Sequence, residues 1–398
     1  MTSESMITRI KTPMAVLCLC IALAVLVMPA TAATQSVTVT RYCDNNYAVV
    51  DDSTTLNTTP TLMGMAQYPI SSNISMQGLV TPTDWANSGL NQADFQDGWD
   101  ATESVNLGNY GAHNGTLVED IVLQVGGMPD GSEIMIADST YPKATRYFNK
   151  TNVYEPIAGQ GEMVLCWWDS EYGFVPGWTK GMRLFFYSEN DLTFSNQDMK
   201  NCFAPWYWQF SKDKKSDFVG PSAKGLSVQT VDTINIYPPH RYDFATGGDT
   251  VEYAYEGGVG ASPGLNDPSD TTVDTSKIAA DDSVYEQTDS KATGEYAAQR
   301  FVFNVTEDAA NIEKLAVTWN GTSSHDNSGA DQGATTYIWK NGTGYESISG
   351  NITSNIGDYV VNGNVTVLVK QNAAHVALPA KASHLATDYV KLVVTHHH

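Results

Sequence analysis

Short runs of alternating apolar and polar residues recur along almost the whole chain. The segments TINIY, within residues 230–237, and RFVFNV, residues 300–305, show the pattern most clearly. A period of two places one face of a strand in a core and the other face in solvent. Gly, Asn and Pro turns separate the runs, and long helical periodicity is nearly absent. We therefore predict an all-β protein built from two, or three, sandwich or jelly-roll domains. The other expected strands are residues 36–40, 117–125, 163–168, 182–187, 359–370 and 389–395.

The first 32 residues have the order of an export signal. Arg9 and Lys11 precede the apolar residues 14–28, and the small residues Ala30 and Ala32 follow. This is the arrangement of a cleaved signal peptide. The apolar stretch is shorter than the roughly 20 residues that a membrane-spanning helix needs. We expect a secreted protein without a transmembrane anchor, located at the cell surface.

The net charge limits the kinds of partner that the chain can bind, and changes in composition divide the chain into regions. Forty-four acidic residues against 22 basic ones give a net charge of −22, which repels phosphate backbones, so we expect no nucleic-acid partner. Residues 33–255 are rich in aromatic residues and are predicted to form one large β domain or two small ones. Residues 256–280, rich in Gly, Pro and Asp, are predicted to be a linker or a long surface loop. Residues 281–395 have the length of one β-sandwich.

Three cysteines remain after cleavage of the signal peptide: Cys43, Cys166 and Cys202. An odd number in an oxidising compartment leaves one thiol free or paired between chains. None lies in a CxxC pair, so we expect no structural zinc centre. We predict one internal disulfide and one intermolecular disulfide, and the sequence does not decide which cysteine forms which.

Glycosylation motifs of the form N-x-S/T are more frequent than chance predicts. After export they are candidate N-glycosylation sites. Asn-Gly-Thr also makes good β-turns, so the motifs starting at Asn114, Asn320 and Asn341 have a purely structural alternative. The candidate asparagines are Asn57, Asn73, Asn114, Asn149, Asn304, Asn320, Asn341, Asn351 and Asn364.

Trp206, Tyr207 and Trp208 are the candidate interface residues, because aromatic side chains are favoured in subunit contacts. On a strand, Trp206 and Trp208 share one face and Tyr207 takes the other. If the two Trp side chains face the core, Tyr207 points outward. Core packing, a subunit contact and stacking on a sugar ring are three alternatives for these aromatic residues.

Motifs for catalysis are missing. The chain has no H-E-x-x-H, no G-x-S-x-G, no Walker loop and no G-x-G-x-x-G after a strand, so we do not expect an enzyme. Asp281 with Asp282, and Asp326 with Asp331, offer the hard oxygen ligands that a structural Ca²⁺ takes, but without EF-hand spacing. Such residues are also common in turns. We expect no other cofactor.

The C-terminal part carries a set of residues that together form a moderately specific pattern: Asp281, Asp282, Trp319, Asn320, Gly321, Tyr337, Trp339, Thr387, Asp388 and Tyr389. With this set it resembles a jelly-roll module found in secreted proteins of methanogenic archaea, which is distantly similar to galactose-binding sandwiches. The whole chain, with its leader, its acidic β-rich aromatic body and its few cysteines, resembles the major envelope proteins of methanogens, especially those of the tubular sheath. This resemblance implies a structural protein that assembles with itself through lateral β contacts and interchain disulfides.

The prediction from sequence is therefore a self-assembling component of an extracellular envelope, either a sheath or a surface layer. Export without an anchor, the odd number of cysteines and the supply of sheet edges all agree with it. The partners would be copies of the same chain, and also glycans or other envelope proteins. The alternative is an extracellular carbohydrate-binding or adhesion protein that uses exposed aromatic residues such as Tyr207 or Trp339.

Overall fold

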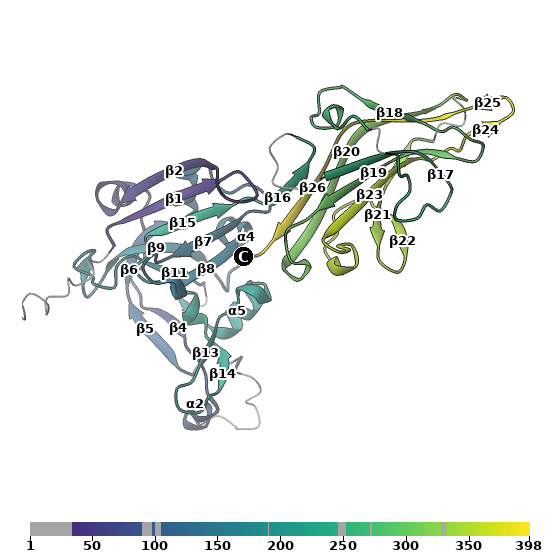
Figure 1. Cartoon of the computed structure of the whole chain (residues 1–398). Coiled ribbons are helices and arrows are strands. Elements are labelled where there is room, and N and C mark those ends of the chain that lie inside the picture. The colour runs from purple at the N-terminus through teal and green to yellow at the C-terminus, as the bar shows by residue number, and fades with distance from the viewer. Residues whose placement is uncertain are drawn as a thin grey trace, which may run out of the picture.

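The computed structural model describes residues 34–89, 98, 99, 105–189, 191–245, 252–270, 273–327, 329 and 332–398. Figure 1 shows the chain. The predicted signal peptide and Asp331 lie outside the described residues. The described residues form several β-sheets with few and short helices, so the predicted all-β class is confirmed. No helix in these residues is both long and apolar enough to cross a membrane.

Two separate hydrophobic cores divide the protein into two domains. One core collects buried side chains between Val37 and Ile236, and the other collects those between Tyr242 and Val394. The boundary falls at Pro238 and Pro239, directly before strand β16 (His240–Asp243). Because proline restricts its own backbone, this connection is short and stiff. In Figure 1 the two bodies lie side by side, and the end of β26 (Ser383–His396) reaches the first of them.

The N-terminal domain is built around a five-stranded sheet in the order β2-β1-β15-β7-β8. β15 runs parallel to β1, with Thr38 opposite Thr233, whereas the other neighbours are antiparallel. The domain's main sheet is therefore completed only when the chain returns near residue 233. Its strands are β1 (Ser36–Tyr42), β2 (Val50–Asn57), β7 (Glu133–Ala137), β8 (Thr145–Asn149) and β15 (Thr233–Tyr237).

A second sheet, β10-β9-β6-β3 with β11 also paired to β9, packs against the same core. Two smaller sheets, β12-β4-β5 and β13-β14, complete the strands of the domain. The strands are β3 (Tyr68–Pro69), β4 (Ile74–Gln77), β5 (Leu107–Gly111), β6 (His113–Leu117), β9 (Glu162–Asp169), β10 (Gly173–Phe174), β11 (Arg183–Tyr187), β12 (Thr193–Phe194), β13 (Phe210–Lys212) and β14 (Val219–Pro221). The helical segments are η1 (Thr58–Leu62), α2 (Pro82–Asn87), α3 (Val118–Val122), η3 (Leu123–Val125), η4 (Pro142–Ala144), α4 (Lys150–Tyr154), α5 (Asn196–Cys202), η5 (Pro205–Tyr207) and η6 (Ala223–Leu226).

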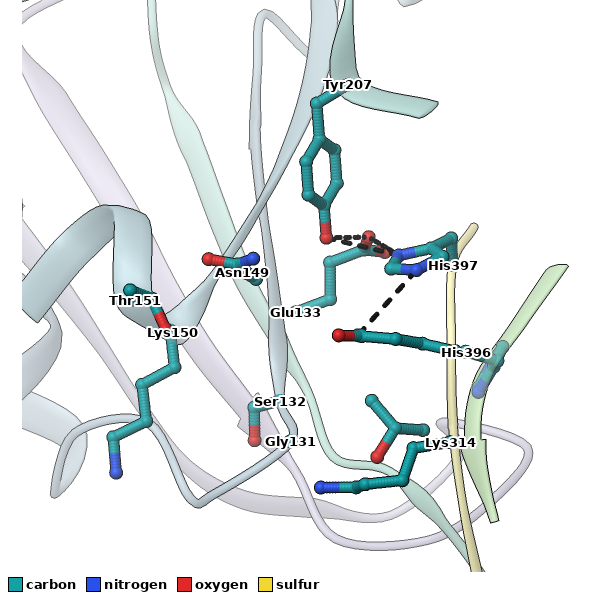
Figure 2. A pocket seen from close by; sticks show the side chains of 12 residues that line it. Gly131, Ser132, Glu133, Asn149, Lys150, Thr151, Tyr207, Lys314, His396 and His397 are labelled. Atoms are coloured by element: carbon teal, nitrogen blue, oxygen red, sulfur yellow. Dashed lines mark hydrogen bonds and ion pairs between the residues drawn. The ribbon is translucent and has the colours of Figure 1, made fainter. Parts of the chain in front are cut away.

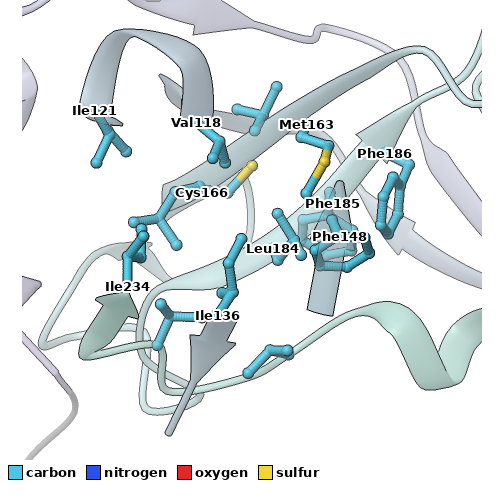
Figure 3. Packing of buried hydrophobic residues seen from close by; sticks show 14 of the residues in the cluster. Val118, Ile121, Ile136, Phe148, Met163, Cys166, Leu184, Phe185, Phe186 and Ile234 are labelled. Carbon is cyan, nitrogen blue, oxygen red and sulfur yellow. The ribbon is translucent and has the colours of Figure 1, made fainter. Parts of the chain in front are cut away.

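Side chains from both large sheets meet in the N-terminal core. Figure 3 shows Ile136 of β7 and Ile234 of β15 in one cluster with Leu184 of β11. All five residues of β11 are buried. A strand covered on both faces is apolar without alternation, which explains the run Leu184, Phe185 and Phe186.

One predicted strand is a helix. A strand was expected over residues 117–125, but only Leu117 is in a strand, as the last residue of β6, and residues 118–125 form α3 and η3. The buried apolar residues follow the helical spacing i, i+3, i+4, i+7, which places them on one face. Gly126 ends the segment in the left-handed region, with a φ of 80°. The residues on the buried face are Val118, Ile121, Val122 and Val125.

The C-terminal domain is a two-layer antiparallel sandwich. In one sheet the 14-residue strand β26 pairs with β20 along one side and with β16 and β18 along the other. The facing sheet has the order β17-β19-β23-β21-β22. The strands are β17 (Glu252–Val259), β18 (Glu286–Asp289), β19 (Tyr296–Asn304), β20 (Ile312–His325), β21 (Ala334–Lys340), β22 (Gly344–Ser347) and β23 (Asn364–Gln371), with the small hairpin β24 (Val376–Ala377) and β25 (Ala380–Lys381). Short helical turns are η7 (Thr275–Lys277), η8 (Ala309–Asn311) and η9 (Ile356–Asp358).

The C-terminal domain begins earlier than predicted. β16 and β17 belong to its two sheets, so the boundary lies before residue 240 and not at 281. Residues 256–259 are the end of β17, and the described part of residues 260–280 is a surface excursion within the sandwich, not a linker between domains. Ile278, fully buried in the C-terminal core, holds the end of this excursion in place.

Candidate functional site

The end of β26 carries the residues that join the two domains. His397 and His398 reach Glu133, on β7 of the N-terminal domain. β26 pairs with β16, which directly follows the Pro238-Pro239 connection. The strand pairing of the sandwich therefore returns the end of β26 to the place where the chain crossed between the domains.

Glu133 is a buried carboxylate that accepts four hydrogen bonds. Tyr207 Oη donates to Oε1 over 2.8 Å, and His397 Nδ1 lies 3.2 Å from the same oxygen. The backbone N–H and Nδ1 of His398 reach Oε2 at 3.2 and 2.7 Å. Burial alone raises the pKa of such a carboxyl, but the bonds from His397, His398 and Tyr207 outweigh it and hold the pKa of Glu133 below its usual value. Figure 2 shows Glu133 between Tyr207 and His397.

Aromatic rings enclose the imidazoles of this cluster. Trp206 stacks on His397 with ring centroids 4.0 Å apart, and Tyr147 lies parallel to His398 at 5.6 Å. A small hollow of about 170 Å³ opens beside Glu133 and is lined by charged side chains of both domains, among them Lys150 and Lys314 (Figure 2). The contact between the domains is thus polar at its centre and aromatic around it.

A second group, of three metal-ligand side chains, lies at the same boundary. His240 on β16, Glu307 after β19 and His396 at the end of β26 each place one ligand atom within 4.8 Å of the others. His240 Nδ1 is hydrogen-bonded to Glu307 Oε1. Among the described residues, no other group of three His, Cys, Asp or Glu side chains lies this close together.

Tyrosine hydroxyls orient this group from both domains. Tyr242 Oη donates to Glu307, at 2.8 and 2.7 Å from its two oxygens, and Tyr47 Oη lies 3.3 Å from His396 Nε2. Burial raises the pKa of a carboxyl, but the hydrogen bonds from His240 and Tyr242 leave the pKa of Glu307 lowered. Burial, with the nearby His240 second, lowers the pKa of His396 to about 4, so its ring is neutral at pH 7.

Two ring nitrogens in this group are unsatisfied. Nε2 of His240 and Nδ1 of His396 are both buried and have no hydrogen-bond partner within the described part of the chain. Buried polar atoms are nearly always paired, so two exceptions in one cluster are a specific feature of this site. Sequence patterns do not indicate this group, because the three residues are far apart along the chain and none lies in a known motif.

The predicted aromatic interface residues take other positions than expected. Residues 206 and 207 lie in the helical turn η5, which Pro205 begins, so the alternation of a strand does not apply. Tyr207 is buried and bonded to Glu133, whereas Trp206 is half exposed. Trp208 packs edge-on against Trp99. Trp206 and Tyr207 do form an interface, but between the two domains of one chain, and the buried Tyr207 has no free face for a sugar.

The three cysteines are free thiols, and the predicted internal disulfide is not formed in the structure. Cys166 is fully buried beside Tyr187 Oη at 3.1 Å, and burial raises the pKa of its thiol to about 12. Cys202 is half-buried, and burial raises its pKa to about 12 as well. Cys43 is exposed in the loop after β1. Cys43 is therefore the thiol best placed to reach another chain.

The candidate glycosylation sites differ in exposure. Asn114, Asn149 and Asn364 are half-buried, and the other six are exposed. Asn149 already caps helix α4 through its side-chain oxygen, and the amide nitrogen of Asn114 donates to Gln67. The exposed asparagines are Asn57, Asn73, Asn304, Asn320, Asn341 and Asn351.

The structure does not bring the predicted calcium ligands together into a cluster of three within the described residues. Asp281 accepts a hydrogen bond from Asn320, and Asp282 accepts one from the backbone of Val284. Asp326 bonds to His384 and to the backbone of Ala382. These carboxylates organise loops, which is the alternative that the sequence had left open.

A larger hollow, of about 450 Å³, lies in the N-terminal domain beside His113 and Asp169. His113 Nε2 is 3.2 Å from Asp169, its Nδ1 is 3.3 Å from the carbonyl of Gly111, and burial lowers the pKa of His113 to about 4. Both ring nitrogens thus face fixed acceptors.

Comparison with known proteins adds one family match. Residues 249–396 match the model of a family described as "Uncharacterized protein, C-terminal domain", which agrees with a sandwich that starts well before residue 281. No curated protein matches the chain. Among solved structures, the sulfane dehydrogenase SoxCD from Paracoccus pantotrophus is similar at 10% identity and a TM-score of 0.30. That alignment covers 90% of this chain and 64% of the other, so the chain spans less than two thirds of that protein's length.

Proposed function

We propose that this protein is a non-catalytic building block of an extracellular envelope and that it assembles with copies of itself through the β1–β2 hairpin. One observation carries the proposal: an unpaired strand edge, an exposed apolar pair and a free thiol all lie on the same hairpin. Each of these features favours contact with a second protein chain.

The strand edge belongs to β2. Within the described residues β2 is the last strand of its sheet and pairs only with β1. Its outer N–H and C=O groups are therefore available to a strand of another copy. Asp51 and Asp52 weaken this edge by their charge, although Asp51 is ion-paired with Arg41. Because salt screens the remaining repulsion between such acidic chains, we expect assembly to strengthen as salt concentration rises.

The apolar pair and the thiol lie at the turn end of the same hairpin, in and beside the loop that joins β1 to β2. Val49 and Val50 are 53% and 49% exposed. The backbone N–H of Cys43 donates to the carbonyl of Val49 over 3.2 Å, so the exposed thiol lies next to the apolar pair. A parallel contact through β2, or an antiparallel contact centred near Val50, would bring two such thiols toward each other. Their oxidation to a disulfide gives up two protons and two electrons to an external disulfide.

The experiment compares assembly of residues 33–398 with matched variants. Oxidised glutathione is added, and products are measured by size-exclusion chromatography with light scattering and by gels with and without reductant. We expect reductant-sensitive dimers and larger species that disappear in Cys43→Ser and persist in Cys202→Ser. Val50→Lys should reduce assembly, whereas Leu378→Lys, at a position 90% exposed on the distant β24–β25 hairpin, should not.

A wild-type chain that stays monomeric at every salt concentration tested, with and without oxidant, contradicts the proposal. Equal assembly of Cys43→Ser and Val50→Lys with the wild type contradicts the assignment to this hairpin. In a host that glycosylates, Asn57→Gln provides a further comparison, because Asn57 is exposed at the far end of β2 and a glycan there would obstruct the edge.

A further inference from the structure

We propose that His240, Glu307 and His396 bind one divalent transition-metal ion, with Zn²⁺ as the reference ion, at the boundary between the two domains. The inference goes beyond self-assembly and does not depend on it. It rests on the chemistry of the three donors, on their unsatisfied nitrogens and on the tyrosines that orient them.

The donor set selects the class of metal. Two imidazoles and one carboxylate are the ligands that Zn²⁺ and its neighbours Co²⁺, Ni²⁺ and Fe²⁺ take in proteins. Ca²⁺ and Mg²⁺ prefer oxygen ligands alone. A His₂Glu set leaves a further coordination position, which a water molecule fills in zinc sites of this composition.

The positions suit an ion after small side-chain movements. Ligand atoms at about 2.0–2.2 Å from a tetrahedral ion lie roughly 3.3–3.6 Å from one another. The three ligand atoms already lie within 4.8 Å of one another, on two neighbouring strands and the turn beside them. Nδ1 of His240 already lies against Glu307 Oε1, so it is the nitrogen of that ring placed to share an ion with the carboxylate. The buried Nδ1 of His396 provides a second nitrogen that no protein group uses among the described residues.

Hydrogen bonds around the three donors resemble those that usually support a metal site. Tyr242 is fully buried and donates to Glu307, and its own oxygen accepts from the backbone N–H of Thr306 at 3.1 Å. Tyr47 contacts His396 from the N-terminal domain. Such outer partners fix ligand orientation, and their loss typically weakens metal binding about 10- to 100-fold.

An ion at this site would also steady the contact between the domains. The loop that carries Tyr47 is joined to β16 because Asn45 bonds to both the N–H and the carbonyl of Arg241, each at 2.8 Å. Metal binding would fix β16 and the end of β26 beneath this loop. Anything that binds the folded state alone stabilises it, so we expect Zn²⁺ to raise the melting temperature.

The test is a calorimetric titration of the metal-free protein, residues 33–398, with Zn²⁺, followed by visible absorption spectroscopy with Co²⁺. We expect one ion per chain. Glu307→Gln and His240→Gln should each bind Zn²⁺ at least about tenfold more weakly, and Tyr242→Phe, which keeps the ring in the core, about tenfold more weakly. His384→Gln is the matched control, because His384 also bonds to two carboxylates, those of Asp289 and Asp326, but lies elsewhere in the sandwich.

Glu307→Gln separates this site from simple chelation by the consecutive His396, His397 and His398. A metal held by these three residues alone would not respond to Glu307→Gln or His240→Gln but would be weakened by His398→Gln, and that result would overturn the proposal. Circular dichroism shows whether each variant is folded. If a ligand variant unfolds, Tyr242→Phe decides: wild-type affinity and an unchanged Co²⁺ spectrum in that variant contradict the site.

Discussion

The two domains bury their chains in different ways. The N-terminal domain mixes parallel and antiparallel strands with short helices, and its core contains an aromatic cluster. The C-terminal sandwich is antiparallel throughout, and aliphatic residues from β23 and β26 fill much of its core. The aromatic residues of the first domain therefore serve mainly its core. The composition change near residue 256 marks a different type of core, and it follows the domain boundary at Pro238-Pro239 by some distance. The clustered rings are those of Phe148, Phe186, Phe194 and Phe203.

The largest expected effect tests whether the two cores are independent. Phe186 and Phe303 are both fully buried, one in each core. Replacing either by Ala removes a packed ring and leaves a cavity, at a cost of about 3–5 kcal/mol. In differential scanning calorimetry we expect Phe186→Ala to lower the transition of the first domain and Phe303→Ala that of the second. A single transition that shifts equally in both variants would show that the two domains unfold as one unit.

A smaller effect is expected at the contact between the domains. Glu133→Ala removes the carboxylate that binds Tyr207, His397 and His398, which we expect to cost about 1–3 kcal/mol. Tyr207 Oη and His397 Nδ1 keep their contact with each other at 3.2 Å. The lost free energy belongs to the contact between the domains and not to either core. The two domains should therefore unfold more independently, and their two calorimetric transitions should move apart. Glu313→Ala is the control, because that carboxylate is 43% exposed and lies 3.7 Å from His397. An equal effect of the two variants would argue against a special role for Glu133.

The smallest effect is a pH dependence confined to the C-terminal sandwich. Burial alone lowers the pKa of His384, but its bonds to Asp289 and Asp326, at 2.7 and 3.0 Å, outweigh burial and raise the pKa above its usual value. A group with a raised pKa in the folded state stabilises the fold fully below its unfolded pKa of about 6.5, and the stabilisation is lost as pH rises through the folded value. For a solvent-screened group we expect less than about 1 kcal/mol.

Chemical denaturation below and above the pH range between the unfolded and folded pKa values of His384 measures this change in the stability of the sandwich. His384→Gln should remove that component of the pH dependence while leaving the N-terminal transition unchanged. A wild-type sandwich whose stability does not change over the range, or a variant with the same slope as the wild type, would contradict the assignment to His384.

Prediction from sequence worked where local periodicity and burial agree. The segments TINIY and RFVFNV are strands in β15 and β19, because one strand face meets the core. It failed where a single residue redirects the backbone. Pro205 starts a helical turn that buries Tyr207, and the helical spacing of residues 118–125 outweighed their β-forming valines. Residues 359–363 were expected to be strand, but β23 begins only at Asn364, after the turn η9.

By itself, the sequence determined the all-β class and the acidic net charge, since these depend on composition and on spacing between near neighbours. Only the tertiary structure decided which thiol is exposed, that Glu133 holds the end of β26, and that His240, Glu307 and His396 converge. Those residues are distant along the chain. Their contact depends on strand pairing and on the path through Pro238-Pro239, which no local pattern encodes.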